Sequence, residues 1–185
     1  AQDEVWALAE EWRLPVTTTP GGRGIISEDH PLALGLTGLY FNPVGAEAFA
    51  RADLVIAVGS RLEQFQTSGW TILPEGARLI QVDIEPFEIG RNYVPDVAVV
   101  GDARLVLRQL LAALRGRISP SSLPWGNWSG SLSDAKSAYL SEVTRECQTE
   151  EVPIRTKRIV WELGQVFGPE TILVNENGSQ DLWTY

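Results

Sequence analysis

The sequence contains one cysteine and one histidine, and it contains no methionine. A single thiol, Cys147, permits neither an internal disulfide nor a zinc site built from cysteines. This usage favours a reducing compartment, so we expect a cytoplasmic protein. The first residues show no basic stretch followed by an apolar one, as a signal peptide would, and we expect position 1 to be a cut end.

The lack of long apolar runs and the shortage of Lys and Arg limit the partners that the protein can bind. No apolar run approaches the roughly 20 residues that a membrane helix needs, so we expect no membrane partner. Lys and Arg number 15 against 24 Asp and Glu, a net charge of -9. Nucleic-acid binders present clustered cations to the phosphates, so we expect no nucleic acid.

His30 lies in Ser-Glu-Asp-His-Pro-Leu with no nucleophile-and-base arrangement around it, and we interpret it as part of a turn.

Hydrophobic periodicity gives an alternation of helices and strands. Val5, Leu8, Ala9 and Trp12 form one helical stripe, and they predict a helix over residues 3–13 with Trp6 and Trp12 in the core. Strands are predicted at 14–19, 54–58, 78–83 and 97–100, with helices between them, including 43–52 capped by Asn42 and 102–116 capped by Asp102. Such alternation predicts an α/β fold, a Rossmann-like parallel sheet with helices on both faces.

The composition changes after residue 116. Residues 117–150 are rich in Ser, Pro and Gly, and we interpret them as a linker with a helical stretch at 132–147, in which Trp125 and Trp128 pack against a neighbouring domain. Residues 151–185 begin another unit, in which Ile159, Val160, Leu163, Val166 and Phe167 share a helix face and 171–175 is a strand. We therefore expect a first domain at 1–116, the linker, and the start of a second domain.

Glycine, arginine and acidic residues follow the predicted strands. Pro-Gly-Gly-Arg-Gly at 20–24 lacks the full pattern of a P-loop or of a dinucleotide fingerprint, so by itself a plain turn is a better interpretation than a phosphate loop. Gly-Ser-Arg at 59–61, Asp-Ile-Glu-Pro at 83–86 and Gly-Asp-Ala at 101–103 follow three other strands. Because ligands of parallel sheets bind at the carboxyl ends of the strands, these loops together indicate one nucleotide site. Asp83 and Glu85 also suggest a carboxylate pair, for which ribose or adenine contact or solvation is the better interpretation than acid/base work.

Several ordered motifs carry a family resemblance. The segments LAEEWRLPVTTTPGGRG, HPLALGLTG, ADLVIAVGSRL, ARLIQVDIEPFEIGRN and VAVVGDARLVLRQLL resemble the central domain of thiamine-diphosphate-dependent enzymes of the acetolactate synthase type. TILVNENGSQDLW is similar to the first strand of their diphosphate-binding domain. The resemblance places a further strand, preceding residue 1, inside the sheet, and the chain looks like a middle slice of such an enzyme.

The resemblance also implies function. The parent enzyme is a transferase or lyase that uses thiamine diphosphate and Mg²⁺ on a 2-oxo acid or aldehyde, with cofactor sites outside this chain, and it is a homo-oligomer. The Gly-Asp-Ala at 101–103 is not the metal motif of that family, and we expect no catalytic residue, no metal ligand set and no activity in this chain. In relatives the central domain holds the adenine part of FAD, or ADP, or nothing.

Carried over by motif, the nucleotide-binding candidates lie at the strand ends: Thr19, Gly22, Gly24, Leu36, Thr37, Gly38, Gly59, Ser60, Arg61, Asp83, Ile84, Asp102 and Ala103. Gly178, Ser179 and Gln180 correspond to the position near the diphosphate in an intact parent. Arg23 departs from the family, since flavin-binding synthases usually carry an apolar residue there. Two alternatives stay open: a free-standing NAD- or FAD-binding module, and a scaffold domain without a ligand.

Overall fold

The computed structural model describes residues 1–40, 42–168, 170–174 and 178. Its contacts divide the chain into two compact units, residues 1–135 and residues 136–185, and each is described by itself. The division falls inside the helical stretch of the predicted linker rather than at residue 116. None of the helices in the described ranges is both long and apolar enough to cross a membrane.

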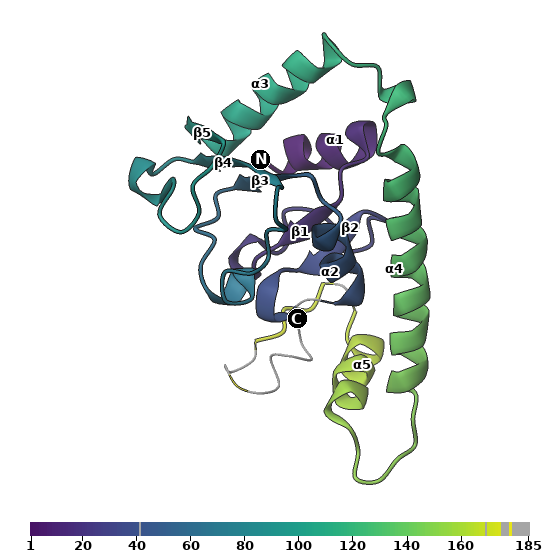
Figure 1. The fold of residues 1–185 in the computed structure, drawn as a ribbon. Coiled ribbons are helices and arrows are strands. Elements are labelled where there is room, and N and C mark those ends of the chain that lie inside the picture. The colour runs from purple at the N-terminus through teal and green to yellow at the C-terminus, as the bar shows by residue number, and fades with distance from the viewer. Residues whose placement is uncertain (41, 169, 175–177, 179–185) are drawn as a thin grey trace. The chain divides into compact units, whose positions relative to one another are not determined.

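The first unit contains two parallel sheets (Figure 1). β1 (Val16–Thr18) pairs with β2 (Ala33–Leu36), and β3 (Leu54–Val58), β4 (Arg78–Asp83) and β5 (Val97–Val100) form the second sheet in that order. Among the residues described, β1 and β3 each have a strand partner on one side only. The sequence led us to expect one parallel sheet, whereas the described strands form two. The predicted α/β class with parallel strands is confirmed.

The sequence did not predict β2, and the reason is local. This strand has four residues, and one of them is Gly35 at a φ of 81°, a conformation that favours glycine and interrupts a regular strand pattern. Its partner β1 is shorter than the predicted strand at 14–19. Tertiary pairing with β1, rather than local preference, makes this segment a strand.

Two helices pack together on the three-stranded sheet. α1 (Gln2–Trp12) and α3 (Ala103–Arg115) bury Leu8, Trp12, Leu107 and Leu111, all at most 7% exposed, and Val58 of β3 packs against this cluster. Burying one such side chain contributes about 1.5–3 kcal/mol, so this cluster is a main source of the unit's stability. Trp6 is 46% exposed, so its predicted place in the core is wrong: it lies on the outer face of α1, edge-on to the His30 ring.

Two of the predicted helices begin at the expected caps. α2 (Pro43–Ala50) packs on β2, and its first turn is capped by Asn42, whose side chain accepts from Gly45 N. The Asp102 carboxylate accepts from Leu105 N at the start of α3 in the same way. Both caps were predicted from residue type and position, and both are confirmed.

The connections on either side of β4 contain no α-helix. Residues 59–77 form only a short 3₁₀ turn, η3 (Phe65–Thr67), and residues 84–96 only η4 (Pro86–Glu88). The expectation of helices between these strands is therefore wrong. Gly69, Pro74 and Gly76 interrupt the first connection, and Pro and Gly do the same in the second, so neither offers an uninterrupted helical run.

The predicted linker begins its helix early. A 3₁₀ turn, η5 (Pro120–Ser122), precedes α4 (Gly126–Cys147), whose start was expected near residue 132. The Trp125 indole donates to Trp12 O at 2.7 Å, and Ser129 Oγ donates to Arg13 O at 2.6 Å. These bonds to the end of α1 explain why a Gly- and Ser-rich segment with weak helix preference is helical here.

The second unit contains the rest of α4, α5 (Thr156–Val166) and an extended tail. Residues 171–174 form no strand, so the predicted strand at 171–175 is wrong over its described part, and Asn175 lies outside the described residues. Ile172 and Val174 are 88% and 87% exposed, because a lone strand has no partner for its backbone or its side chains.

Candidate functional site

The loops after β3, β4 and β5 begin side by side. Val58 pairs with Val82, and Asp83 pairs with Val100, so the three strands end at one edge of the sheet. Gly59 N donates to Val82 O at 2.8 Å, and Gly101 N donates to Asp83 O at 2.9 Å. We call the set of loops that follow the strands of the first unit the carboxyl-edge loops, residues 19–24, 37–40, 59–67, 84–90 and 101–102.

The other two loops join this set through close backbone contacts. Thr37 N donates to Thr18 O at 2.9 Å, which places the ends of β1 and β2 together. At Gly38, φ is 69°, and a Cβ there would lie 1.9 Å from Phe65 O, so only glycine fits against the loop that follows β3. Backbone contacts thus connect the loops that follow the five strands, and a single site among them stays a prediction.

The glycine-rich segment at 20–24 is a 3₁₀ turn, η1 (Pro20–Gly22). Thr19 Oγ1 accepts from Gly22 N at 3.2 Å, so the hydroxyl acts within the turn. The Arg23 guanidinium donates to both oxygens of the Glu28 carboxylate, at 2.5 Å and 2.9 Å. Of the two interpretations left open for this segment, the structure favours the turn.

Arg61 is the cation best placed for a phosphate. Its side chain is 63% exposed, and its guanidinium lies 3.7 Å from Glu63 and 3.6 Å from Glu88. Exposed pairs at such separations contribute little, so an incoming phosphate can replace them.

The predicted carboxylates have backbone partners. Asp83 is 8% exposed, and its Oδ1 accepts from Glu85 N at 2.9 Å, while Glu85 Oε1 accepts from Phe87 N at 3.2 Å. Asp102 caps α3, as described above. Each carboxylate has further acceptor capacity, which suits ribose hydroxyls or an adenine amino group, whereas two carboxylates that each hold a turn do not form an acid/base pair.

Thr37 has a buried hydroxyl without a partner. The residue is 8% exposed, and its Oγ1 makes no hydrogen bond. Buried polar atoms are normally paired, so an unpaired hydroxyl among these loops fits a group that a ligand completes. Gly59, at a φ of 61°, has open space where a Cβ would stand, so a ligand can approach the backbone there. These two observations fit a ligand site at these loops.

The other carried-over residues are less informative. Ser60 Oγ accepts from Leu62 N at 3.3 Å, Ile84 is 70% exposed and Leu36 is buried. Gly178 lies exposed in the second unit, and Ser179 and Gln180 lie outside the described residues.

Sequence reasoning missed a buried glutamine below these loops. Gln81 is 2% exposed in β4 and bonds to the loop after β3 and to the loop after β4. A polar residue in the middle of Arg-Leu-Ile-Gln-Val-Asp, an otherwise apolar buried strand, was the available signal. In the same connection, between β4 and β5, burial raises the pKa of the Tyr93 phenol, so this side chain stays neutral.

His30 has the role of a turn residue. It is 5% exposed, its Nδ1 accepts from Leu32 N at 3.0 Å, and its Nε2 lies 3.1 Å from Glu10. Because Nδ1 accepts a hydrogen bond, Nε2 carries the ring hydrogen and donates a hydrogen bond to the Glu10 carboxylate. Both ring nitrogens therefore have structural partners.

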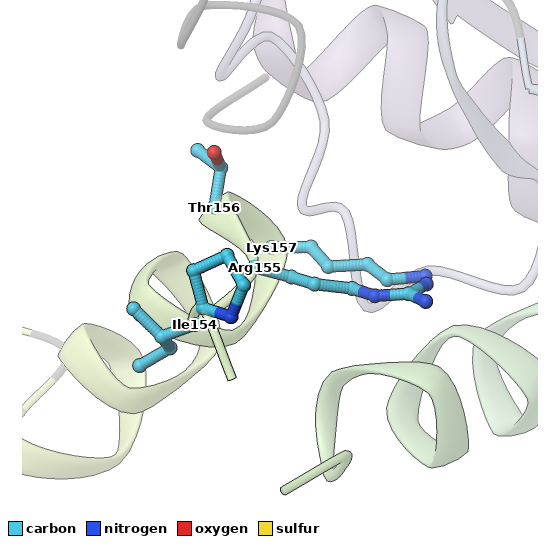
Figure 2. Close-up of a pocket in the computed structure, with 5 residues that line it drawn as sticks. Ile154, Arg155, Thr156 and Lys157 are labelled. Atoms are coloured by element: carbon cyan, nitrogen blue, oxygen red, sulfur yellow. The ribbon is translucent and has the colours of Figure 1, made fainter. Parts of the chain in front are cut away.

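Figure 2 shows a hollow at the start of α5 in the second unit, where Arg155 and Lys157 extend together away from Ile154. Lys157 Nζ donates to Glu146 at 2.6 Å, which holds the pKa of that carboxyl below its usual range, and Arg155 is paired with Glu151. Both cations that line the hollow thus have carboxylate partners. Within the described ranges, no three His, Cys, Asp or Glu side chains gather in an arrangement that could hold a metal ion.

Fold and strand order together define an α/β domain with parallel sheets. The model of the family described as "Thiamine pyrophosphate enzyme, central domain" matches residues 1–110. The chain belongs to this family.

Curated relatives agree with the family match. The chain is 33% identical to a probable acetolactate synthase large subunit of Methanocaldococcus jannaschii, over 99% of this chain and 31% of that protein. It is 31% identical to an acetolactate synthase of Mycobacterium avium, over 99% of this chain and 29% of that protein. An acetolactate synthase large subunit of Cyanidium caldarium is 37% identical over 62% of this chain. The chain thus spans less than a third of the length of these relatives.

Proposed function

We propose that this chain provides the central domain of a thiamine-diphosphate-dependent decarboxylase or carboligase of the acetolactate synthase type, a transferase or lyase acting on a 2-oxo acid or aldehyde. We propose further that its carboxyl-edge loops bind an adenine nucleotide, either ADP or the adenine half of FAD. The observation that carries the second proposal is the buried, unpaired hydroxyl of Thr37 in a loop where the ends of β1 and β2 meet.

The proposed contacts follow from the chemistry of each group. The Arg61 guanidinium faces the phosphates, because a planar cation matches phosphate oxygens, and the open space beside Gly59 lets them approach the backbone. Asp83 and Asp102 accept from ribose hydroxyls or from the adenine amino group. The Thr37 hydroxyl donates to a ligand oxygen. Arg23 takes no part, since the Nε–Nη2 edge of its guanidinium already donates to both oxygens of the Glu28 carboxylate.

Thiamine diphosphate is the cofactor of the family, and Mg²⁺ accompanies it in the function that we propose. Among the described residues, no three His, Cys, Asp or Glu side chains gather where they could hold that ion. We therefore propose that residues 1–185 bind neither of them and turn over no substrate without the other domains of such an enzyme. Cofactor chemistry of this kind belongs to the cofactor, and the protein supplies position and electrostatics.

Two wider proposals rest on less specific evidence. The single cysteine, Cys147, is buried and unpaired, which suits a reducing cytoplasm. We also propose that the parent enzyme is a homo-oligomer, on the strength of the family resemblance.

Calorimetric titration of the chain with ADP tests the proposed site. We expect saturable binding by the wild type and no Mg²⁺-dependent binding of thiamine diphosphate. Asp83→Asn keeps an oxygen to accept from Glu85 N and removes the charge, so it should weaken ADP about tenfold or more, the cost of one hydrogen bond to a charged group. Asp134→Asn, the same change at an exposed residue of α4, is the control and should leave the affinity unchanged.

The outcomes separate the alternatives. No ADP binding by the wild type would favour the ligand-free scaffold. Tighter binding of NAD than of ADP would favour the free-standing module. Equal ADP affinity in the wild type and in Asp83→Asn would remove Asp83 from the site.

A further inference from the structure

Gln81 occupies a position that joins two of the carboxyl-edge loops. It lies on β4, 2% exposed, beneath the loop that follows β3 and the one that follows β4 itself. Its Nε2 donates to Glu88 O at 3.1 Å and to Ser60 O at 3.4 Å, and its Oε1 accepts from Gly90 N at 2.9 Å. All of these partners are backbone groups, so the bonds fix loop conformation whatever side chains the loops carry.

Only a primary amide suits these partners. Two carbonyl oxygens need donors and one N–H needs an acceptor, and the glutamine side chain presents two N–H donors at one atom and a carbonyl at the other. A carboxylate would set its lone pairs against the two carbonyls. An apolar side chain would leave three buried backbone groups unpaired, and each such group carries a desolvation penalty.

A second bond ties the same two loops near Arg61. Asn92 Nδ2, just beyond the loop after β4, donates to Arg61 O at 2.8 Å. Glu88, whose carbonyl Gln81 holds, is the carboxylate that lies 3.6 Å from the Arg61 guanidinium. The Asn92 contact thus fixes the backbone of Arg61. The Gln81 contact fixes the backbone of Glu88, whose carboxylate is the one nearest to the Arg61 guanidinium.

We infer that Gln81 is a positioning residue for the proposed nucleotide site, which holds the loops after β3 and β4 together and so sets where Arg61 and Asp83 meet the ligand. We call the hydrogen bonds from Gln81 to the two loops the clamp. The clamp rests on geometry alone, whereas the ligand in this inference rests on the proposed function. Gln81 contacts no ligand itself. Its effect on affinity comes from fixing the two loops before binding, which lowers the ordering cost that a ligand would otherwise meet.

The experiment compares Gln81→Met with Gln109→Met in the full chain. Methionine fills a similar volume without donors or an acceptor, and Gln109 is exposed on α3, so the same change there is a matched control. Hydrogen exchange followed by NMR should show the Gly90 amide exchanging about tenfold faster or more in Gln81→Met, while the Gly101 amide, bonded to Asp83 O, stays protected. ADP affinity should fall about tenfold in Gln81→Met and stay unchanged in Gln109→Met.

Each arm decides a different claim. Unchanged Gly90 exchange in Gln81→Met would overturn the clamp. Faster Gly90 exchange with unchanged ADP affinity would overturn the positioning role. Absence of ADP binding in the wild type would defeat the proposed function, and the exchange measurement would still decide the clamp. If Gln81→Met does not fold, the exposed Asn92→Ala removes the second tie, and an ADP affinity equal to that of the wild type would count against positioning of Arg61 by these contacts.

Discussion

Two threonines on contacting loops differ in what their hydroxyls do. Thr67 is fully buried, and its Oγ1 donates to Glu63 O at 2.8 Å and accepts from Trp70 N at 3.1 Å. Thr37 Oγ1 is buried without a partner. A buried polar atom stabilises a fold when it is paired and costs free energy when it is not.

Valine substitutions test this contrast at the residue scale. Thr67→Val should lower the free energy of unfolding by about 1–3 kcal/mol, because two backbone groups lose their partner. Thr37→Val should leave it within about 0.5 kcal/mol or raise it, while weakening ADP. Urea denaturation followed by tryptophan fluorescence gives both values. A loss of stability in Thr37→Val as large as that in Thr67→Val would show that the Thr37 hydroxyl already has a partner in the free protein.

At the scale of elements, one ion pair joins α1 to α3. Arg115 hydrogen-bonds Glu11, and this bond, with the charge of the guanidinium, holds the pKa of the Glu11 carboxyl below its ordinary value of 4.5. A carboxyl whose pKa falls on folding stabilises the fold above its ordinary pKa and loses that contribution as the pH drops through its folded pKa. Both side chains are partly exposed, so the effect is small and is screened by salt.

Glu11→Gln should therefore lower the melting temperature slightly at pH 7, and the difference from the wild type should shrink as the pH falls below about 4.5. Glu75→Gln, at an exposed residue outside this pair, is the control. Melting curves between pH 7 and about pH 3 provide the test. A difference that grows toward acid would contradict the assigned direction of the pKa shift.

The docking of α4 on the end of α1 gives a second test at this scale. Ser129 is fully buried, and its Oγ donates to Arg13 O, the carbonyl of the left-handed residue that ends α1. Ser129→Ala should cost about 1–2 kcal/mol, because that carbonyl loses its partner. Ser131→Ala, on an exposed face of the same helix, shares any gain in helix preference and should cost nothing. Equal stabilities of the two variants in urea would show that the Arg13 contact does not hold α4.

At the scale of the whole molecule, the division into two units predicts independent stability. Residues 171–174 form no strand. A chain that ends at residue 149 should keep the melting temperature of the first unit within about 2 °C. Calorimetry measures it, and light scattering reports the mass of both chains. A fall of more than about 4 °C in melting temperature after deletion would show that the second unit stabilises the first.

The sequence by itself determined the features that depend on near neighbours. Capping by Asn42 and Asp102, the apolar stripe of α1 that ends at Trp12, and the strands β3 to β5 all follow from residue type and spacing. Their energetics are local or repeat along one element, so a single sequence carries them. The ordered motifs also indicated the family, which the match over residues 1–110 shows.

Tertiary structure decided what depends on partners distant in the sequence. β2 is a strand because β1 lies beside it, α4 begins early because Trp125 and Ser129 bond to the end of α1, and residues 171–174 stay extended because no strand pairs with them. The candidate site shows the same contrast, since residue types predicted its loops but did not predict the Gln81 contacts. Backbone groups that satisfy a buried amide leave no pattern in the sequence, because any residue supplies a carbonyl or an N–H, and only the folded chain brings Ser60, Glu88 and Gly90 to one glutamine.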